Sequence, residues 1–160
     1  MLLGEKMFGK KMNRKGITLI ELIVVMVIIA IGAVLMAPNI GGWLPNYRLR
    51  SATRDITSTM RVAQMKAVSN NIQYRVNLND GEVGAGNYIL QYNSGGLWIN
   101  EGALQTLPSG IIISAITIPA KHAEFNTNST SSTGSLTLQN TKGSQRRITL
   151  TPTTGRVTVD

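Results

Sequence analysis

The 160-residue chain contains no cysteine and only one histidine, His122. Without cysteine it has no disulfide, no thiolate metal site and no thiol nucleophile. A single histidine excludes a multi-histidine metal centre, and the sequence has no G-x-S-x-G turn that would mark a serine nucleophile. We therefore interpret His122 as a surface residue whose hydrogen bonds are satisfied.

Acidic residues and nucleotide-binding motifs are also scarce. The chain has eight aspartates and glutamates, and it contains no phosphate-binding loop or dinucleotide fingerprint. Asp80 and Glu82 flank Gly81 in a predicted turn, but two carboxylates fall short of the roughly six to eight oxygen ligands that Ca²⁺ takes. We expect no enzymatic activity, no catalytic residues, no cofactor and no metal site.

Basic residues, by contrast, are abundant, and the net charge of +8 divides between two parts of the chain. The first 16 residues carry one acid, Glu5, and five basic residues: Lys6, Lys10, Lys11, Arg14 and Lys15. From residue 38 onward, eleven basic residues and six acids give a net charge of +5. Because basic residues beside an apolar segment mark its cytoplasmic end, only the charge beyond residue 38 bears on a binding partner.

One apolar run dominates the sequence, from Ile17 to Ala37, with Glu21 as its single charged residue. Its 21 residues would form a helix of roughly 30 Å, the thickness of a bilayer's hydrocarbon core. The run therefore predicts a membrane-spanning helix. The basic flank is expected to keep the first residues in the cytoplasm, so the chain from Pro38 onward is predicted to lie outside it.

Two positions have features of cleavage sites. Ala30-Ile31-Gly32 loosely matches the small-residue pattern of a secretory signal, but the apolar run continues past it. The junction between Gly16 and Ile17 separates the charged leader from the apolar run. A cut at this junction would leave the whole helix on the mature protein, whereas an uncut chain would be a plain membrane-anchored domain.

The segment KGITLIELIVVMVIIAIGAVLMAP resembles the N-terminal motif of type IV pilins and type II secretion pseudopilins. Gly16 precedes the cut in this motif, Ile17 is the first mature residue, Glu21 is the fifth and Pro38 is the twenty-second. The family's first mature residue is most often phenylalanine, from which Ile17 departs. The resemblance implies that a prepilin peptidase cleaves after Gly16 and N-methylates Ile17, and that other pilins or pseudopilins are partners in a helical filament.

Glu21 needs a partner or a function, because a carboxylate in hydrocarbon costs at least about 2.5 to 3.5 kcal/mol. It lies four residues after Ile17 and therefore on the same helix face as the amine that cleavage would create. One interpretation places Glu21 at the solvated membrane interface. The favoured one pairs its carboxylate with that amine, and the family resemblance implies that this pairing joins neighbouring subunits and sets the filament stagger.

Residues 38–71 are predicted to form a hinge and an amphipathic helix. Pro38, Gly41, Gly42 and Pro45 are helix breakers, so the first helix is expected either to kink or to end at Pro38. A second helix is predicted from Tyr47 to Ser69, with an apolar stripe of Ala52, Ile56, Met60, Ala63 and Ala67. Its basic residues form either a solvated face or a docking surface: Arg48, Arg50, Arg54, Arg61 and Lys66.

Residues 72–160 alternate between short strand patterns and turns. Ile72 to Leu78 alternates apolar and polar residues, and Asn93 to Gly96 predicts a hairpin turn between Tyr88–Tyr92 and Leu97–Ile99. Further strands are predicted at Ile111–Ile118, Ala123–Phe125, Leu136–Leu138, Arg147–Thr151 and Val157–Val159. The predicted fold class is α+β, with a long N-terminal helix packed on a C-terminal antiparallel sheet domain.

The C-terminal segment EFNTNSTSSTGSLTLQNTKGSQRRITLTPTTGRVTVD resembles GspH/FimT-type pseudopilins, through Phe125, Gly134, Gly143 and Gly155-Arg156-Val157. This resemblance implies a minor pseudopilin of a type II secretion or type IV pilus filament that supports protein export across the envelope. The implied location is the bacterial inner membrane, crossed once by residues 17–37 after removal of residues 1–16. The domain of residues 72–160 would be extracytoplasmic, which is periplasmic in a diderm.

An alternative function rests on four basic residues near the C-terminus: Lys142, Arg146, Arg147 and Arg156. Two antiparallel strands joined by the turn at 152–155 would place Arg147 and Arg156 within reach of each other. Such a patch could hold phosphates in salt-dependent, sequence-independent DNA binding. The chain would then resemble FimT-like minor pilins that take up DNA, although these carry a further arginine where this chain has Thr158.

Overall fold

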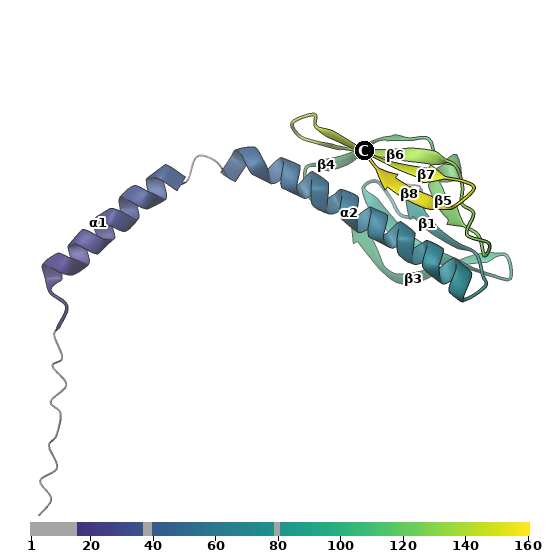
Figure 1. Cartoon of the computed structure of the whole chain (residues 1–160), viewed down its shortest axis with the longest axis horizontal. Helices are drawn as coiled ribbons and strands as arrows, with labels where there is room; N and C mark the ends of the chain where they lie inside the picture. Colours follow the sequence, from purple (N-terminus) through teal and green to yellow (C-terminus); the bar gives the residue numbers. More distant parts are fainter. Residues whose placement is uncertain (1–15, 37–39, 79–80) are drawn as a thin grey trace, which may run out of the picture. The chain divides into compact units, whose positions relative to one another are not determined.

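The computed structural model describes residues 16–36, 40–78 and 81–160 and divides into two compact units, residues 1–40 and 41–160 (Figure 1). The first unit contains helix α1 (Leu19–Met36), and the second contains nearly all of helix α2 (Ile40–Ser69) and every strand of the described part. The basic leader, the predicted hinge at Pro38 and the turn residue Asp80 lie outside the described residues.

Helix α1 consists almost entirely of apolar residues, with Glu21 in its first turn. Residues 19–31 of the helix are exposed, and Ile28, near its middle, is 64% exposed. In the part of the chain that the structure describes, no helix combines the length and the hydropathy needed to cross a membrane.

Helix α2 begins earlier than the sequence pattern predicts. It includes Gly41, Gly42 and Pro45, which were expected to keep the chain non-helical before Tyr47. Pro45 lies in the second turn, where its missing N–H leaves the Gly41 carbonyl oxygen without a hydrogen bond from residue 45. Trp43 and Tyr47 stack one turn apart with ring centroids separated by 4.9 Å, which also stabilises this turn.

The predicted apolar stripe of α2 is confirmed. Its members are at most 1% exposed, and they contact the strands through the hydrophobic core: Ala52, Ile56, Met60, Ala63 and Ala67. Burial of a side chain such as Ile56 or Met60 stabilises the fold by about 1.5–3 kcal/mol. After Ser69 the helix ends, and Asn71 adopts a left-handed conformation with φ of 54°.

One four-stranded antiparallel sheet has the strand order β3-β2-β1-β5. The predicted hairpin is confirmed as β2 and β3, and the side-chain oxygen of Asn93 accepts a hydrogen bond from the Gly96 backbone N–H in its turn. Strand β3 extends far beyond the predicted end at Ile99. The sequence pattern did not predict the extension, because β3 is an exposed edge strand without apolar alternation. The strands are β1 (Tyr74–Leu78), β2 (Asn87–Ser94), β3 (Leu97–Thr106) and β5 (His122–Phe125).

The second antiparallel sheet has the order β4-β6-β7-β8. The β7–β8 pairing places Leu150 opposite Val157, and both side chains are buried. The predicted strand from Ile111 ends at Ile116 and is followed by the short 3-10 helix η2 (Pro119–Lys121). The strands are β4 (Ile111–Ile116), β6 (Gly134–Asn140), β7 (Gln145–Thr151) and β8 (Arg156–Val159).

Both sheets and α2 share one hydrophobic core. Phe125 comes from the first sheet and Leu136, Leu138 and Ile148 from the second, and none of these side chains is exposed to solvent. In Figure 1 strands β6, β7 and β8 are seen above α2 and β3 below it. The predicted α+β class, with a long helix packed on antiparallel sheets, is confirmed.

Candidate functional site

The predicted processing site lies just before α1. Gly16 and Ile17 have no regular secondary structure and are exposed, with Ile17 76% exposed. A Cβ atom added at Gly16 would meet nothing within 4 Å, so packing within the described chain does not require glycine there. The bond between the two residues is therefore accessible. Cleavage and methylation at this bond stay predictions.

Thr18 caps α1, a role that the sequence reasoning missed. Its side-chain oxygen accepts a hydrogen bond from the Glu21 backbone N–H at 3.3 Å, and its carbonyl oxygen accepts one from the Leu22 N–H at 3.2 Å. An N-cap threonine followed by a glutamate three residues later is the pattern T-x-x-E that marks a helix start. This pattern is visible in the sequence, at the start of the apolar run.

The Glu21 side chain is exposed, and no cation of the described residues pairs with it. Its position in the first turn places its negative charge near the positive end of the α1 dipole. Glu21 therefore has a local role in α1 and a carboxylate that is available to a partner. The predicted pairing with a neighbouring subunit stays a prediction.

Strand register sets the positions of the arginines in the predicted C-terminal basic patch. Along β7, Ile148 and Leu150 face the core, so Arg146 lies on the core side of the sheet and Arg147 on the opposite face. Arg156 pairs with Thr151, four residues along β7 from Arg147. This register separates the backbones of Arg147 and Arg156 by roughly 14 Å along the strand, so they are not cross-strand partners, and the predicted patch stays a prediction.

Lys142 lies in the turn between β6 and β7. Its Nζ donates a hydrogen bond to the Gly42 carbonyl oxygen at 3.0 Å, which links the turn to the first turn of α2. Asn140 reinforces this link through a hydrogen bond from its side-chain nitrogen to the side-chain oxygen of Asn46 at 2.8 Å. Lys142 thus has a structural contact that the sequence pattern did not reveal.

The basic residues of α2 divide into three groups. Arg48 donates hydrogen bonds to the backbone and side-chain oxygens of Ser109, at 3.1 and 3.2 Å. Lys66 forms an ion pair with Glu101 of β3, and this hydrogen bond raises the pKa of Lys66. The remaining three, Arg50, Arg54 and Arg61, are exposed and lie on one stripe of the helix.

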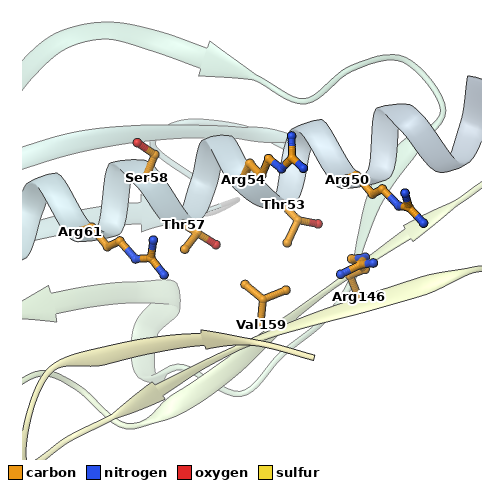
Figure 2. A pocket seen from close by; sticks show the side chains of 8 residues that line it. All are labelled: Arg50, Thr53, Arg54, Thr57, Ser58, Arg61, Arg146 and Val159. Atoms are coloured by element: carbon orange, nitrogen blue, oxygen red, sulfur yellow. The ribbon is translucent and has the colours of Figure 1, made fainter.

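These three arginines line a cavity of about 650 Å³ together with Arg146 of β7 (Figure 2). The cavity lies between α2 and the β7–β8 hairpin. We call it the arginine groove, and its remaining lining residues are Thr53, Thr57, Ser58 and Val159. Among the described residues, no carboxylate pairs with any of its four arginines. The groove therefore presents four uncompensated positive charges around a floor of threonine and valine side chains.

A second polar cluster lies on the first sheet and surrounds the buried Arg75. Its guanidinium donates to Gln91 Oε1 at 2.6 Å and to His122 Nδ1 at 2.9 Å, and it lies 4.3 Å from the centroid of the Trp98 ring. Because arginine only donates, His122 Nδ1 accepts and the imidazole proton lies on Nε2. His122 is thus a satisfied histidine, as predicted, and the described residues contain no group of acids, histidines or cysteines that could hold a metal.

Known proteins are similar to this chain in an N-terminal sequence motif and in the fold of most of the chain. Residues 11–37 match the family model of the prokaryotic N-terminal methylation motif. The fold resembles the minor pseudopilin EpsH of the Vibrio cholerae type 2 secretion system, with a TM-score of 0.59, 11% identity, and coverage of 71% of this chain and 96% of that one. The fold of the chain is pilin-like.

A second pilin-like relative in structure is the type IV minor pilin FimU of Pseudomonas aeruginosa. The TM-score is 0.55 at 14% identity, and the match covers 72% of this chain and 90% of that one. A search of curated proteins by sequence gives no match. The segment that matches the methylation motif, residues 11–37, contains Gly16, Ile17 and Glu21, the three residues predicted for processing and assembly.

Proposed function

We propose that this chain is a minor pilin-like subunit of a type II secretion or type IV pilus filament. A prepilin peptidase cleaves it after Gly16 and N-methylates Ile17. Residues 17–37 first anchor it in the bacterial inner membrane, with the unit of residues 41–160 outside the cytoplasm, and then pack against other subunits. The protein has a structural role in protein export and no enzymatic activity.

The observation that carries this proposal is the exposed apolar surface of α1. Thirteen large hydrophobic residues between Ile17 and Val34 are between 46% and 77% exposed. A continuous apolar surface of this kind is unstable in water and marks contact with lipid or with other proteins. A helix that is covered by lipid before assembly and by neighbouring helices afterwards satisfies this requirement in both states.

The N-terminal processing can be tested by mass spectrometry of the full chain isolated from membranes of the native bacterium. A mature N-terminus at Ile17 carrying one methyl group is the expected result. An intact Met1, or an N-terminus near Gly32, would contradict the proposal. As a control, a Gly16→Leu variant should retain its leader and remain in the membrane fraction.

The assembly role of Glu21 can be tested with Glu21→Gln, which removes the charge and keeps the side chain's size. We expect normal membrane insertion but loss of the subunit from sheared or cross-linked filaments. Glu124→Gln, in β5, removes the same charge from a partly buried site of the other unit and should assemble normally. Equal incorporation of both variants would contradict the proposed role of Glu21.

DNA uptake through the C-terminal hairpin is the alternative function, and it has less support. A hairpin patch needs Arg147 and Arg156 close together, and the β7–β8 register separates them. Gel shifts of the full chain in nonionic detergent, across several salt concentrations, test it. Retarded duplex DNA whose binding weakens with salt and is lost when Arg147 and Arg156 are both changed to glutamine would favour this alternative over a purely structural subunit.

A further inference from the structure

We infer that the arginine groove binds an acidic segment of a neighbouring protein, through at least two carboxylates presented to α2 and β7. This inference rests on the proposed filament function for the source of the neighbour. The chemistry of the site is independent of the proposed function, because it follows from the residues around the groove.

The four arginines of the groove have no anionic partner among the residues that the structure describes. Arg50, Arg54 and Arg61 come from α2 and Arg146 from β7, and none forms an ion pair within the described chain. Figure 2 shows Arg50 and Arg146 on one side of the cavity and Arg61 on the other. Four like charges around one cavity repel each other, and a bound anion removes that repulsion. Guanidinium groups bind carboxylates through paired hydrogen bonds, which makes them suited to this ligand.

Thr57 provides an independent sign of a missing ligand. Its hydroxyl oxygen is buried and has no hydrogen-bond partner in the described structure, although the residue is 5% exposed and lines the groove. The threonine one turn earlier, Thr53, instead donates to the Leu49 carbonyl oxygen at 2.7 Å. A buried hydroxyl without a hydrogen-bond partner is unfavourable. A hydrogen bond between the Thr57 hydroxyl and a polar ligand in the groove would therefore stabilise the complex.

The spacing of the arginines suits a polypeptide. Arg50 and Arg54 are one helical turn apart, roughly 6 Å along the axis. Alternate residues of an extended peptide are roughly 6.8 Å apart on one face, and residues four apart on a helix are roughly 6 Å apart. A segment with acidic residues at either spacing can therefore place successive carboxylates against successive arginines.

The shape of the groove favours a protein over nucleic acid. A DNA duplex is too large to enter a cavity of about 650 Å³. It would contact only the arginines at the rim and would not reach the buried Thr57. Single strands are usually held by aromatic stacking, and the groove contains no aromatic residue. Its floor of Val159 and two threonines matches the mixed apolar and polar surface of a peptide.

A second copy of this chain is a poor occupant. From residue 38 onward it has six acids, and two of them, Glu82 and Glu101, already form ion pairs with Arg75 and Lys66. The expected occupant is therefore a different subunit with closely spaced acidic residues.

The test measures binding of a fluorescent peptide to the full chain in nonionic detergent by anisotropy. The probe alternates glutamate and threonine over eight residues, and the control peptide has glutamine in place of glutamate. Arg54→Gln and Arg146→Gln should each weaken binding of the acidic peptide by about fivefold or more. Arg147→Gln should change it less than twofold, because Arg147 has the same charge but lies on the opposite face of β7.

Thr57→Val separates a binding role from a structural one. This variant keeps the side chain's shape and removes the unpartnered hydroxyl, so the melting temperature should stay the same or rise while peptide binding weakens. Equal weakening by Arg146→Gln and Arg147→Gln would overturn the inference, since it would indicate only a general positive field. Equal binding of the glutamine peptide would also overturn it.

Two competition outcomes identify other occupants. Displacement of the acidic peptide by an oligonucleotide at lower concentration, lost in Arg54→Gln, would overturn the inference in favour of a phosphate ligand. Self-association that depends on Arg54 would overturn it in favour of a second copy. Failure of filament incorporation with normal peptide binding would count against the proposed function and leave the groove's chemistry supported.

Discussion

The two helices of this chain bury their apolar residues in different ways. Helix α2 buries Ile56 completely against strands of the same chain, whereas Ile28 of α1 is 64% exposed. The apolar face of α2 packs against strands of the same chain, whereas no described residue packs over most of the apolar surface of α1. The second unit is therefore stabilised by contacts within the chain, whereas the apolar surface of α1 stays exposed in the described structure.

The largest expected effect comes from one substitution made in both helices. Ile56→Ala should lower the free energy of unfolding by about 2–5 kcal/mol, because it leaves a cavity in the core. Ile28→Ala should leave it unchanged within about 0.5 kcal/mol. Denaturant unfolding of the full chain in detergent, followed by tryptophan fluorescence, checks this. A similar loss in both variants would break the distinction between the helices.

A smaller effect is expected at Gly155, where the β7–β8 turn packs on α2. A Cβ atom there would lie 2.4 Å from the Ser129 carbonyl oxygen and 2.6 Å from Gln64 Nε2, and φ is +60°. Gly155→Ala should cost about 2–4 kcal/mol from backbone strain and steric overlap. Gly95→Ala is the matched control, because φ is +61° there and no atom lies within 4 Å.

Gly95→Ala should cost only about 1–2 kcal/mol, the strain of the left-handed conformation. The difference between the two variants measures how tightly the β7–β8 turn covers α2. If thermal unfolding shows that both variants lose the same stability, the β7–β8 turn can shift to accommodate the added Cβ. The turn would then pack less tightly on α2 than the contacts indicate.

Removal of the α1 cap should have a local effect. Thr18→Ala removes the hydrogen bond from the Glu21 N–H and should destabilise the start of α1 by about 1 kcal/mol. Faster amide hydrogen exchange in residues 19–22 is the expected readout, with no change in the melting of residues 41–160. Thr18→Ser should retain the cap. A shift in melting would show that the two units unfold together.

The smallest effect concerns pH. Burial raises the pKa of the Tyr88 hydroxyl above its usual range, and the Asp55 carboxylate of α2 raises it further. Since the folded state holds the proton more tightly, stability is fully present below about pH 10 and falls as the pH rises through the folded-state pKa. Tyr88→Phe should reduce the fall in melting temperature above pH 10, and an unchanged fall would contradict this assignment.

Much of the second unit was predictable because its patterns are local. The stripe from Ala52 to Ala67 follows helical spacing, and Asn93 to Gly96 marks a hairpin turn. The early start of α2 was missed, because Gly41 and Pro45 disfavour a helix locally and the stacking of Trp43 on Tyr47 acts against this preference. Pairwise packing of this kind is not contained in residue propensities.

The groove was less predictable than the fold. Arg54 and Arg61 were predicted among the basic residues of α2, but Arg146 joins them only because of how β7 packs beside α2. The sequence places Arg146 and Arg147 side by side, and the alternation of a strand sends them to opposite faces. Which of two adjacent arginines belongs to a site thus depends on strand register, which depends on contacts distant in sequence.

The position of the Thr18 cap has a consequence for the maturation of the chain. The proposed cut precedes Ile17, so the capping threonine stays with the helix and the precursor and product begin α1 at the same residue. The cut also replaces a neutral peptide group with a positive amine at the positive end of the helix dipole, which is unfavourable by about 0.3–1 kcal/mol. Glu21 offsets this cost from the first turn, so leader removal changes the charge at the helix start without unwinding it.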